Sequence, residues 1–373
     1  MYSFMKPYTF ENGATVRNRI MLAPMTNFAS AENGEVTEEE LAYYKERSKG
    51  VGTVVTAVAN VTPGGKGFPG EIGIDRDDLV DGLTKLADTI KGEGAKAIIQ
   101  MFHAGRMAPP ELLPDKETVS ASAVAPEREG AATPRALTED EIQSIIKAFG
   151  DATRRAIRAG FDGVEIHGAN TYLIQQFFSP HSNRRTDKWG GSVEKRMRFP
   201  LAVVNEVLEA AKEADESFIV GYRISPEEIE NPGITMADTL QFVQELAKED
   251  LDYLHVSVMD FFKGSMREKD DERSRVQLIH DEVGSRIPVV GVGSLHTPDD
   301  VERAMAGGVP LMALGRELIV EPHWIEKVEA GETEAIRTEM SVDDREELVV
   351  PEALWNAIVN RPGWFPVKEH AES

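Results

Sequence analysis

Three polar side chains with different hydrogen-bonding chemistry lie close together in the sequence, at His167, Asn170 and Tyr172. They follow a short apolar segment, 163–166, which is predicted to be a β-strand and is entered through Gly160, a residue typical of helix ends. Neutral histidine and asparagine can donate hydrogen bonds to an oxygen, and tyrosine carries a phenolic proton that can be transferred. The three residues therefore suit a site that holds and polarises a carbonyl group and protonates a nearby atom.

The segments around this site predict a repeated alternation of strands and helices. Eight apolar segments are predicted strands: 19–23, 53–58, 97–102, 163–166, 218–224, 253–258, 288–291 and 311–314. Apolar strands separated by helices indicate a parallel sheet buried on both faces, and eight repeats in this length predict a closed (β/α)₈ TIM barrel, an α/β fold. An open doubly wound sheet is the alternative, but no GxGxxG follows the first strand. No linker divides the chain, so residues 1–373 are predicted to be a single barrel domain.

Helical patterns occupy the intervals between these strands. They cover 37–50, 77–92, 193–214, 236–248 and 298–306. Another helix is predicted to start at a capping box over 138–141, because the apolar stripe Ile142, Ile145, Ile146 and Phe149 follows it.

Two further segments lie outside the predicted strand and helix repeats. Residues 8–16 read as an N-terminal hairpin that turns at Asn12–Gly13, a pair that tolerates a type I′ turn, and this hairpin could cap the closed end. Residues 107–137 show no clean period and are interpreted as an excursion after strand three, over the open face. That excursion either covers a ligand or is a solvated insertion.

Polar residues at the strand ends favour one shared site. Thr26, Gln100, His167 and Arg223 belong to four different strands, and a barrel gathers the carboxyl ends of its strands on one face. Near strands seven and eight lie the segments 291–294 (GVGS) and Gly315–Arg316, the second just before a helix predicted near Glu317. Glycines alone can merely permit tight turns, but their pairing on adjacent strands, with a guanidinium, favours a phosphate cradle.

Composition excludes several functions. The formal charge of −23 and the pI near 4.8 argue against a nucleic-acid partner or an acidic membrane surface. The chain has no cysteine, which excludes disulfides, thiolate nucleophiles, iron–sulfur clusters and Cys-ligated zinc. No signal-peptide or membrane-spanning pattern is found, so we expect an intracellular, cytoplasmic protein.

The chain resembles the Old Yellow Enzyme family of FMN-dependent ene reductases along almost its whole length. The motifs that carry the resemblance are 18–20 (NRI), 23–25 (APM), Gln100 with 103–106 (HAGR), 167–170 (HGAN) with Tyr172, 182–187 (SNRRTD) with 190–192 (GGS), Arg223, and Gly315–Arg316. The resemblance implies a barrel that holds FMN non-covalently. It also implies reduction by NADPH or NADH and reoxidation by a small electron-poor acceptor such as an activated alkene.

The resemblance also implies roles for individual residues. Pro24, Met25 and Thr26 are similar to the segment beside the flavin, with Val58, Gln100 and Arg223 as further flavin contacts, and Gly293, Gly315 and Arg316 as phosphate ligands. His167 and Asn170 resemble the pair that grips the substrate's activating oxygen, and Tyr172 resembles the proton donor.

The sequence departs from the family pattern at three places. Thr26 and Phe28 stand where one branch has Cys and Tyr, and Asn170 replaces a second His while keeping a donor amide. The terminal segment 361–364 (RPGW) is similar to a carboxyl-terminal Arg that some relatives insert into a neighbouring subunit, so a homo-oligomer is one expectation.

Several alternatives remain from the residues alone. His167 could be a core histidine bonded to Glu165, and Tyr172 could only pack. A glycoside hydrolase needs a second carboxylate, which strand seven lacks, and the eight scattered histidines do not suggest a metal site. A flavin-dependent reductase of quinones or nitro compounds, or a flavin-binding protein without turnover, are the other readings.

Overall fold

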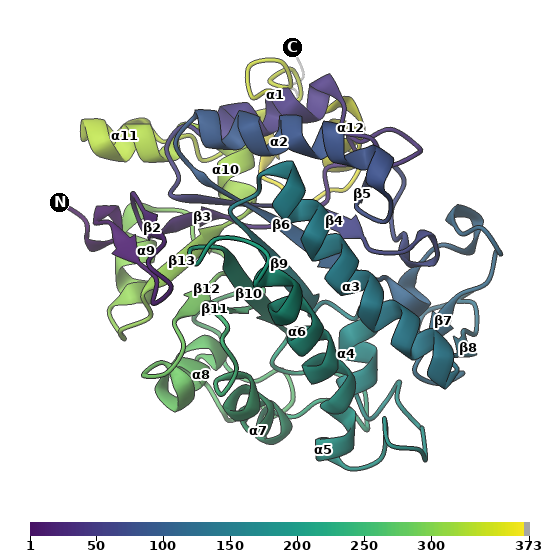
Figure 1. The fold of residues 1–373 in the computed structure, drawn as a ribbon. Helices are drawn as coiled ribbons and strands as arrows, with labels where there is room; N and C mark the ends of the chain where they lie inside the picture. The colour runs from purple at the N-terminus through teal and green to yellow at the C-terminus, as the bar shows by residue number, and fades with distance from the viewer. Residues whose placement is uncertain (369–373) are drawn as a thin grey trace.

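The fold is a closed barrel of eight parallel strands, described by a computed structural model over residues 1–368 (Figure 1). The strands are β3 (Ile20–Leu22), β4 (Thr53–Asn60), β6 (Lys96–Phe102), β9 (Gly163–Gly168), β10 (Ile219–Ile224), β11 (Tyr253–Val256), β12 (Val289–Gly291) and β13 (Leu311–Leu314). β3 pairs with both β13 and β4, which closes the sheet, and the short β5 (Ile72–Gly73) pairs in parallel alongside the end of β4. The predicted (β/α)₈ barrel is confirmed.

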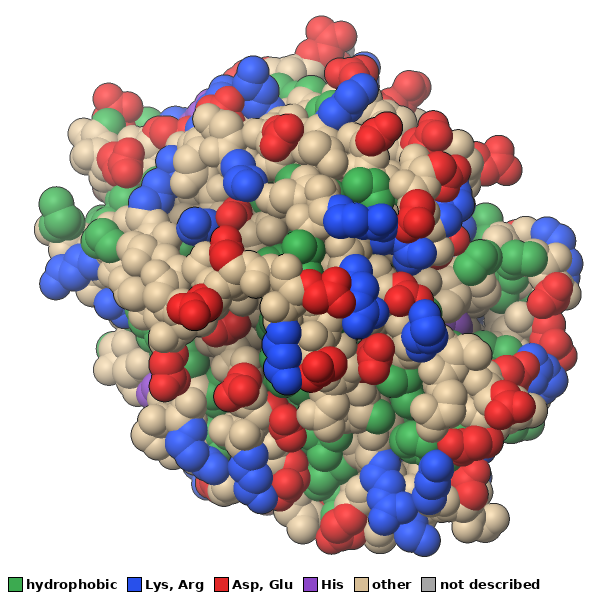
Figure 2. All heavy atoms as spheres, in the orientation of Figure 1, with side chains coloured by type: hydrophobic (Ala, Val, Ile, Leu, Met, Phe, Trp, Pro, Cys, Tyr) green, Lys and Arg blue, Asp and Glu red, His purple; other side chains and the backbone are tan. Residues whose placement is uncertain are grey.

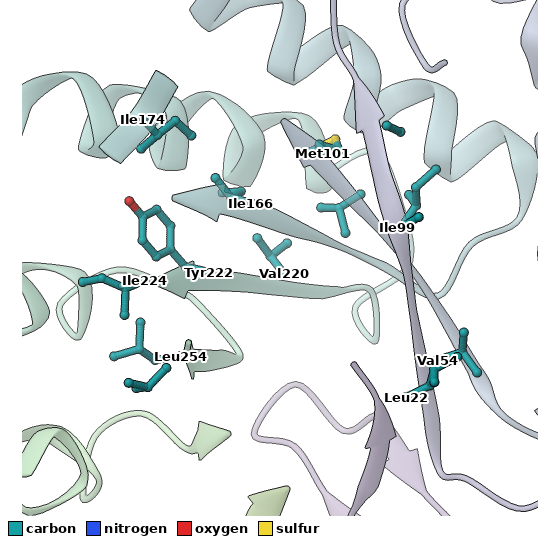
Figure 3. Close-up of a cluster of buried hydrophobic side chains, with 14 of the residues drawn as sticks. Leu22, Val54, Ile99, Met101, Ile166, Ile174, Val220, Tyr222, Ile224 and Leu254 are labelled. Atoms are coloured by element: carbon teal, nitrogen blue, oxygen red, sulfur yellow. The ribbon is translucent and has the colours of Figure 1, made fainter. Parts of the chain in front are cut away.

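The strands are buried on both faces, which explains their continuous apolar sequences. On β10, Val220, Tyr222 and Ile224 belong to the large core cluster between the barrel and the surrounding helices, and Figure 3 shows them among the labelled side chains of neighbouring strands. Because side chains alternate along a strand, Gly221 and Arg223 point to the barrel interior. The same alternation on β9 sends Glu165 and His167 inward.

Helices surround the barrel on its outer face (Figure 1). They are α1 (Glu38–Arg47), α2 (Val80–Gly92), α3 (Glu139–Ala159), α4 (Leu173–Phe178), α5 (Val193–Arg196), α6 (Arg198–Ala211), α7 (Met236–Leu246), α8 (Arg275–Val283), α9 (Pro298–Met305), α10 (Arg316–Val320), α11 (Trp324–Ala330) and α12 (Glu352–Val359). The predicted capping box is confirmed: Thr138 and Glu141 bond reciprocally at the start of α3. α3 ends at Gly160, whose φ is +86°.

The helix predicted over 193–214 is two helices that meet at Met197. Proline has no backbone N–H, so Pro200 cannot donate to the carbonyl of Arg196, and a continuous helix would lose a bond at this point. Pro200 fits instead in the first turn of α6, where a backbone N–H has no helical partner.

The N-terminal hairpin forms from β1 (Tyr8–Thr9) and β2 (Thr15–Val16) as predicted, but its turn is not type I′. A type I′ turn needs positive φ at two residues, and only Gly13 has one, at +90°. Asn12 stays in an ordinary conformation because its side-chain oxygen accepts a bond from Ala14 N–H and its amide donates to the carbonyl of Phe218. Phe10, 2% exposed, packs into the barrel's end cluster, so the hairpin caps this end.

The excursion over 107–137 contains one small parallel pair, β7 (Val119–Ser120) with β8 (Arg135–Ala136), on the side of the molecule away from the hairpin (Figure 1). Ala108 and Leu113 pack with Phe102 and Tyr172 in a small apolar cluster. The excursion therefore supplies part of the apolar packing around Tyr172.

Acidic and basic side chains are interspersed over the face shown in Figure 2 rather than gathered by sign. Within residues 1–368, no helix combines the length and the apolar character that a membrane crossing requires.

Candidate active site

Polar side chains that point into the barrel form two layers on the neighbouring strands β6, β9, β10 and β11. In strand register, Gln100 on β6 pairs with Glu165 on β9, and Arg223 on β10 pairs with His167 on one side and His255 on the other. Parallel strands in register bring side chains of equal height together inside the barrel. The structure therefore brings together Gln100, His167 and Arg223, as predicted.

β9 runs through Gly168, two residues beyond its predicted end, so His167 lies within the strand. The chain then turns through Asn170 and Thr171, whose φ values of +55° and +72° are unusual for residues other than glycine. Ser225 Oγ accepts a hydrogen bond from Asn170 N–H at 2.9 Å and stabilises this turn. The turn places Tyr172 directly before α4, close to His167.

Two adjoining cavities contain every predicted site residue. A cavity of about 130 Å³ is lined by Pro24, Met25, Thr26, Val58, Gln100, His167, Asn170, Tyr172 and Arg223. A second cavity of about 500 Å³ shares Pro24, Met25, Thr26 and Arg223 with the first, and Gly293, Gly315 and Arg316 line it too. The roles assigned to these residues by the resemblance stay predictions, but their assembly at one end of the barrel agrees with a single site.

His167 is neutral. Burial, followed by the nearby Arg223 guanidinium, lowers its pKa to about 3. Its ring packs against both Phe102, at a centroid distance of 6.2 Å, and Tyr172, at 5.2 Å. Nδ1 is buried and has no hydrogen-bond partner within the chain, so His167 retains hydrogen-bonding capacity for a bound molecule.

Tyr172 keeps its phenolic proton at neutral pH. Burial, and then the charge of Glu71, raise its pKa above the usual value. The ring packs edge-on against Phe102 at 4.9 Å, which fixes its direction relative to the cavity. A protonated and oriented phenol is the state that a proton donor needs.

Asn170 has partners that the sequence did not indicate. Its Oδ1 accepts a hydrogen bond from Arg223 at 2.9 Å, and its Nδ2 donates to Ser257 Oγ at 3.0 Å. One N–H of the amide is left for a ligand. The structure therefore gives Asn170 a second task, which is to orient Arg223.

A buried carboxylate lies beneath the cavities. Glu165 accepts hydrogen bonds from Gln100 Nε2 at 2.8 Å, from the Tyr253 hydroxyl at 2.6 Å and from His255 Nδ1 at 3.2 Å. Burial alone would raise the pKa of Glu165, but His255, Arg223 and the hydrogen bonds outweigh it and hold the pKa at about 2. The alternative of a core pair between Glu165 and His167 is wrong, because Glu165 bonds His255 instead.

This floor fits the ring of FMN. Because Gln100 donates its amide to Glu165, its side-chain oxygen is left to accept a hydrogen bond from a ring N–H. Arg223 is 9% exposed and its Nε is buried without a partner in the chain, so a guanidinium donor is available to a ring oxygen. The charge of Arg223 would stabilise the negative charge that a flavin gains on reduction.

The larger cavity fits the phosphate end. Gly293 has φ +125°, and a Cβ there would approach the backbone nitrogens of Asp260 and Phe261 within 2.9 Å, so only glycine fits. Arg316 lines the cavity and donates from Nη1 to the carbonyl of Trp364 at 2.8 Å. A guanidinium beside a glycine-lined wall suits a phosphate monoester.

Sequence reasoning missed several residues of the two cavities and their floor. The residues not foreseen in the larger cavity are Phe68, Val258, Met259, His296 and Phe365. Phe28 lines this cavity too, and so do Arg361 and Trp364 of the terminal segment 361–364, which therefore lies against the cavity of its own chain. Tyr253 and His255 could have been found, because polar residues at alternate positions of an apolar strand mark an inward face, as Glu165 and His167 do. Phe68 lies in a loop that carries no periodic signal.

The fold and the two cavities define a flavin-binding (β/α)₈ oxidoreductase. Residues 3–334 match the family described as NADH:flavin oxidoreductase / NADH oxidase, and the chain belongs to this family. Together with its structural neighbours, this places it among the Old Yellow Enzymes, with FMN as cofactor and NADH or NADPH as reductant.

Individual relatives agree with this placement. A probable NADH-dependent flavin oxidoreductase of Bacillus subtilis, YqiG, is 51% identical over 98% of this chain and 98% of its own. An NADH:fumarate oxidoreductase of Klebsiella pneumoniae is 44% identical over 94% of this chain, which spans only 38% of that protein. The structure of morphinone reductase in complex with tetrahydroNAD aligns over 100% of this chain and 99% of its own, with a TM-score of 0.79 and 25% identity.

Proposed function

We propose that this NAD(P)H-dependent flavin oxidoreductase reduces carbon–carbon double bonds that are conjugated to a carbonyl group, with Tyr172 as the proton donor. Gln100, Arg223, Gly293 and Arg316 would hold FMN, which would supply hydride transfer from NADH or NADPH to the electron-poor alkene carbon. The chain must then hold the substrate's oxygen and protonate the other alkene carbon.

One observation carries the proposal. A neutral histidine and a protonated tyrosine, with ring centroids 5.2 Å apart, line the same small cavity as Arg223 and Gln100. A neutral imidazole can donate to a carbonyl oxygen, and a nearby phenol can supply a proton to a carbon of the same molecule.

Each residue has a separate task in this proposal. His167, with the remaining N–H of Asn170, holds the carbonyl oxygen and stabilises the negative charge that develops on it. Tyr172 gives its proton to the carbon next to the carbonyl. Phe102 and Tyr172 shield the histidine ring from water, which strengthens its hydrogen bond to the substrate.

The names of two relatives support an alkene acceptor. The relatives at 44% and 45% identity are an NADH:fumarate oxidoreductase and an NADH:acrylate oxidoreductase, and both acceptors are alkenes conjugated to a carboxylate. This chain spans only 38% and 36% of those proteins, so their acceptors suggest a class of reaction and not a substrate for this chain.

The experiment is an anaerobic screen of the FMN-loaded protein with NADH or NADPH and a panel of enones, quinones and nitro compounds. We expect enones to be converted to saturated ketones, identified by gas chromatography. Turnover of quinones alone would assign the protein to quinone reduction, and no turnover of any acceptor would leave a flavin-binding protein.

A further inference from the structure

A third cavity opens beside the proposed active site. It has a volume of about 1030 Å³ and lies over the loops that follow β10 and β11. Asn170 lines both this chamber and the small catalytic cavity, and Val258 and Met259 line both the chamber and the larger cavity. A molecule whose reactive end lies at His167 could therefore extend its other end into the chamber.

The chamber collects exposed apolar side chains. Five large hydrophobic residues are exposed among residues 1–368, and four of them line the chamber: Ile229, Met259, Phe262 and Met266. Met259 is 88% exposed and Ile229 is 77% exposed. Apolar side chains gathered around a cavity mark a binding site, and methionine adapts its shape to different ligands.

The walls of the chamber are held in place by buried polar contacts. Glu227 forms an ion pair with Arg275 at 3.1 Å, both almost fully buried, and also accepts bonds from Ser265 Oγ and from the backbone N–H of Met266. These contacts tie the loop after β10 to the loop after β11. The chamber therefore exists before a ligand binds.

The charge of the lining disfavours anions. Six acidic residues line the chamber, namely Glu227, Glu228, Glu230, Asp260, Asp271 and Glu272, against the three basic residues Lys263, Lys269 and Arg275. Arg275 is already paired with Glu227 and Asp271. A carboxylate, or the diphosphate of a nicotinamide nucleotide, would meet net repulsion here.

We propose that the chamber binds the apolar, uncharged tail of the acceptor, so that the enzyme prefers long neutral enones to short or anionic ones. This inference rests on the proposed function, because it places the reactive carbonyl at His167. It names the acceptor class that the small catalytic cavity alone does not define.

The first test compares ethyl vinyl ketone with heptyl vinyl ketone, using the FMN-loaded enzyme and NADH. Burying additional methylene groups favours the longer ketone, so we expect its kcat/KM to be about ten- to a hundredfold higher. The double variant Ile229→Ser, Met266→Ser removes exposed apolar surface from the chamber and should reduce this ratio to within about threefold. Equal kcat/KM values for the two ketones in the unmodified enzyme would overturn the proposal.

The second test concerns charge. A vinyl ketone whose alkyl chain ends in a carboxylate should be turned over at least about tenfold less efficiently than its methyl ester. The double variant Glu230→Gln, Glu272→Gln removes two charges from the lining and should narrow this difference. The control variant Glu11→Gln, Glu129→Gln removes two exposed charges that do not line the chamber, and it should leave the difference as it is.

A binding measurement separates this inference from the proposed function. Calorimetric titration with para-ethylphenol and para-heptylphenol needs no turnover, and each phenol places its oxygen where the acceptor's carbonyl oxygen would lie. The longer phenol should bind to the oxidised holoenzyme at least about tenfold more tightly than the shorter one. If enones are not reduced but the longer phenol still binds more tightly, the proposed function is wrong and the inference that the chamber binds an apolar tail still holds. Equal affinity for the two phenols, or no binding of either, would overturn the proposal that the chamber binds the acceptor's tail. A rise in the KM for NADH in the Ile229→Ser, Met266→Ser variant would show instead that the chamber binds the nucleotide.

Discussion

At the scale of single residues, His167 and Tyr172 line the same small cavity, and burial shifts their pKa values in opposite directions. Burial favours the uncharged form of both His167 and Tyr172, so the histidine loses its proton and the tyrosine keeps its own. The same desolvation thus prepares a neutral hydrogen-bonding ring and a proton donor side by side. In the proposed mechanism, this arrangement lets two groups of very different ordinary pKa act together near pH 7.

Replacing Tyr172 with Phe tests whether the hydroxyl does chemistry or only packs. General acid catalysis contributes about 10²- to 10⁴-fold, so Tyr172→Phe should slow enone turnover by this factor. The rate at which NADH reduces the bound FMN, and turnover of quinones, should change little, because neither needs a proton delivered to carbon. Stopped-flow spectroscopy measures the two half-reactions separately.

Tyr222→Phe is the matched control for this variant. Tyr222 is also buried, and its hydroxyl has no hydrogen-bond partner, but it belongs to the cluster outside the barrel and lines neither cavity of the site. An enone rate for Tyr172→Phe within a few-fold of the rate for Tyr222→Phe would remove Tyr172 from the proposed mechanism.

His167 and Asn170 should differ in how they affect a bound oxygen. A simple phenol is expected to bind the oxidised enzyme as its phenolate, with the oxygen at His167. His167→Ala should weaken phenolate binding about ten- to a hundredfold, because a charge-assisted hydrogen bond contributes about 1.5–3 kcal/mol. Asn170 also holds Arg223, so Asn170→Ala should weaken phenol binding less and should alter the absorption spectrum and retention of FMN. An equal loss of phenol affinity in both variants, with FMN unaffected, would make Asn170 a direct oxygen ligand only.

At the scale of strands and helices, much of the fold was predictable because each barrel strand is buried on both faces. The eight apolar segments, the capping box of α3 and the glycine at its end are all local signals, and the structure confirms them. The inward direction of Gln100, His167 and Arg223 also follows from strand alternation and register.

The parts that could not be predicted depend on contacts between distant segments. The hydrogen bonds of Asn170 to Arg223 and Ser257 join the ends of three different strands. No local sequence pattern around Asn170 predicts these two partners. Trp364 lines the larger cavity beside Arg316, whose guanidinium donates to its carbonyl across 48 residues of sequence. Helix α8 is a different case, because its sequence, Ser274 followed by Val276, Ile279 and Val283, is a recognisable helix pattern.

Helix α1 carries a buried acid whose protonation should control stability. Glu40 accepts a bond from Ser30 Oγ at 2.7 Å, but its other carboxyl oxygen is buried without a partner, and burial raises its pKa to about 7. Because the folded pKa lies above the unfolded value of 4.5, the stabilising contribution of Glu40 is complete below pH 4.5 and is lost as the pH rises through about 7.

Glu40→Gln mimics the protonated acid at every pH. Relative to the unmodified protein, this variant should gain up to about 3 kcal/mol of unfolding free energy between pH 4.5 and pH 8, from about 1.4 kcal/mol per pKa unit. Denaturant titrations at the two pH values measure this gain. The exposed Glu38→Gln on the same helix should show no such gain, and a gain of equal size in both variants would mean that burial of Glu40 is not the cause.

At the scale of the whole molecule, the end of the last barrel strand and the carboxyl-terminal segment meet at the larger cavity. Arg316 follows the last barrel strand and holds the carbonyl of Trp364, so the carboxyl-terminal segment forms part of the wall of the larger cavity. Cofactor binding should therefore be coupled to the position of this segment, and FMN should stabilise the folded chain by mass action.

Arg316→Ala should weaken FMN binding about ten- to a hundredfold, because it removes a charge-assisted contact to the phosphate. Fluorescence titration of the apoprotein with FMN gives the dissociation constant. Arg128→Ala, which removes an exposed arginine that lines neither cavity, is the control. An unchanged FMN dissociation constant in Arg316→Ala would place the phosphate elsewhere.

Addition of hydrogen across a carbon–carbon double bond is tested most directly by following the proton that comes from the solvent. The FMN-loaded enzyme reduces cyclohexenone with unlabelled NADH in deuterated water under argon, and the product is analysed by NMR and mass spectrometry. We expect cyclohexanone with deuterium at the carbon next to the carbonyl, because Tyr172 exchanges its proton with solvent before donating it. Consumption of NADH without cyclohexanone, or formation of the unsaturated alcohol by reduction of the carbonyl, would contradict the proposed function.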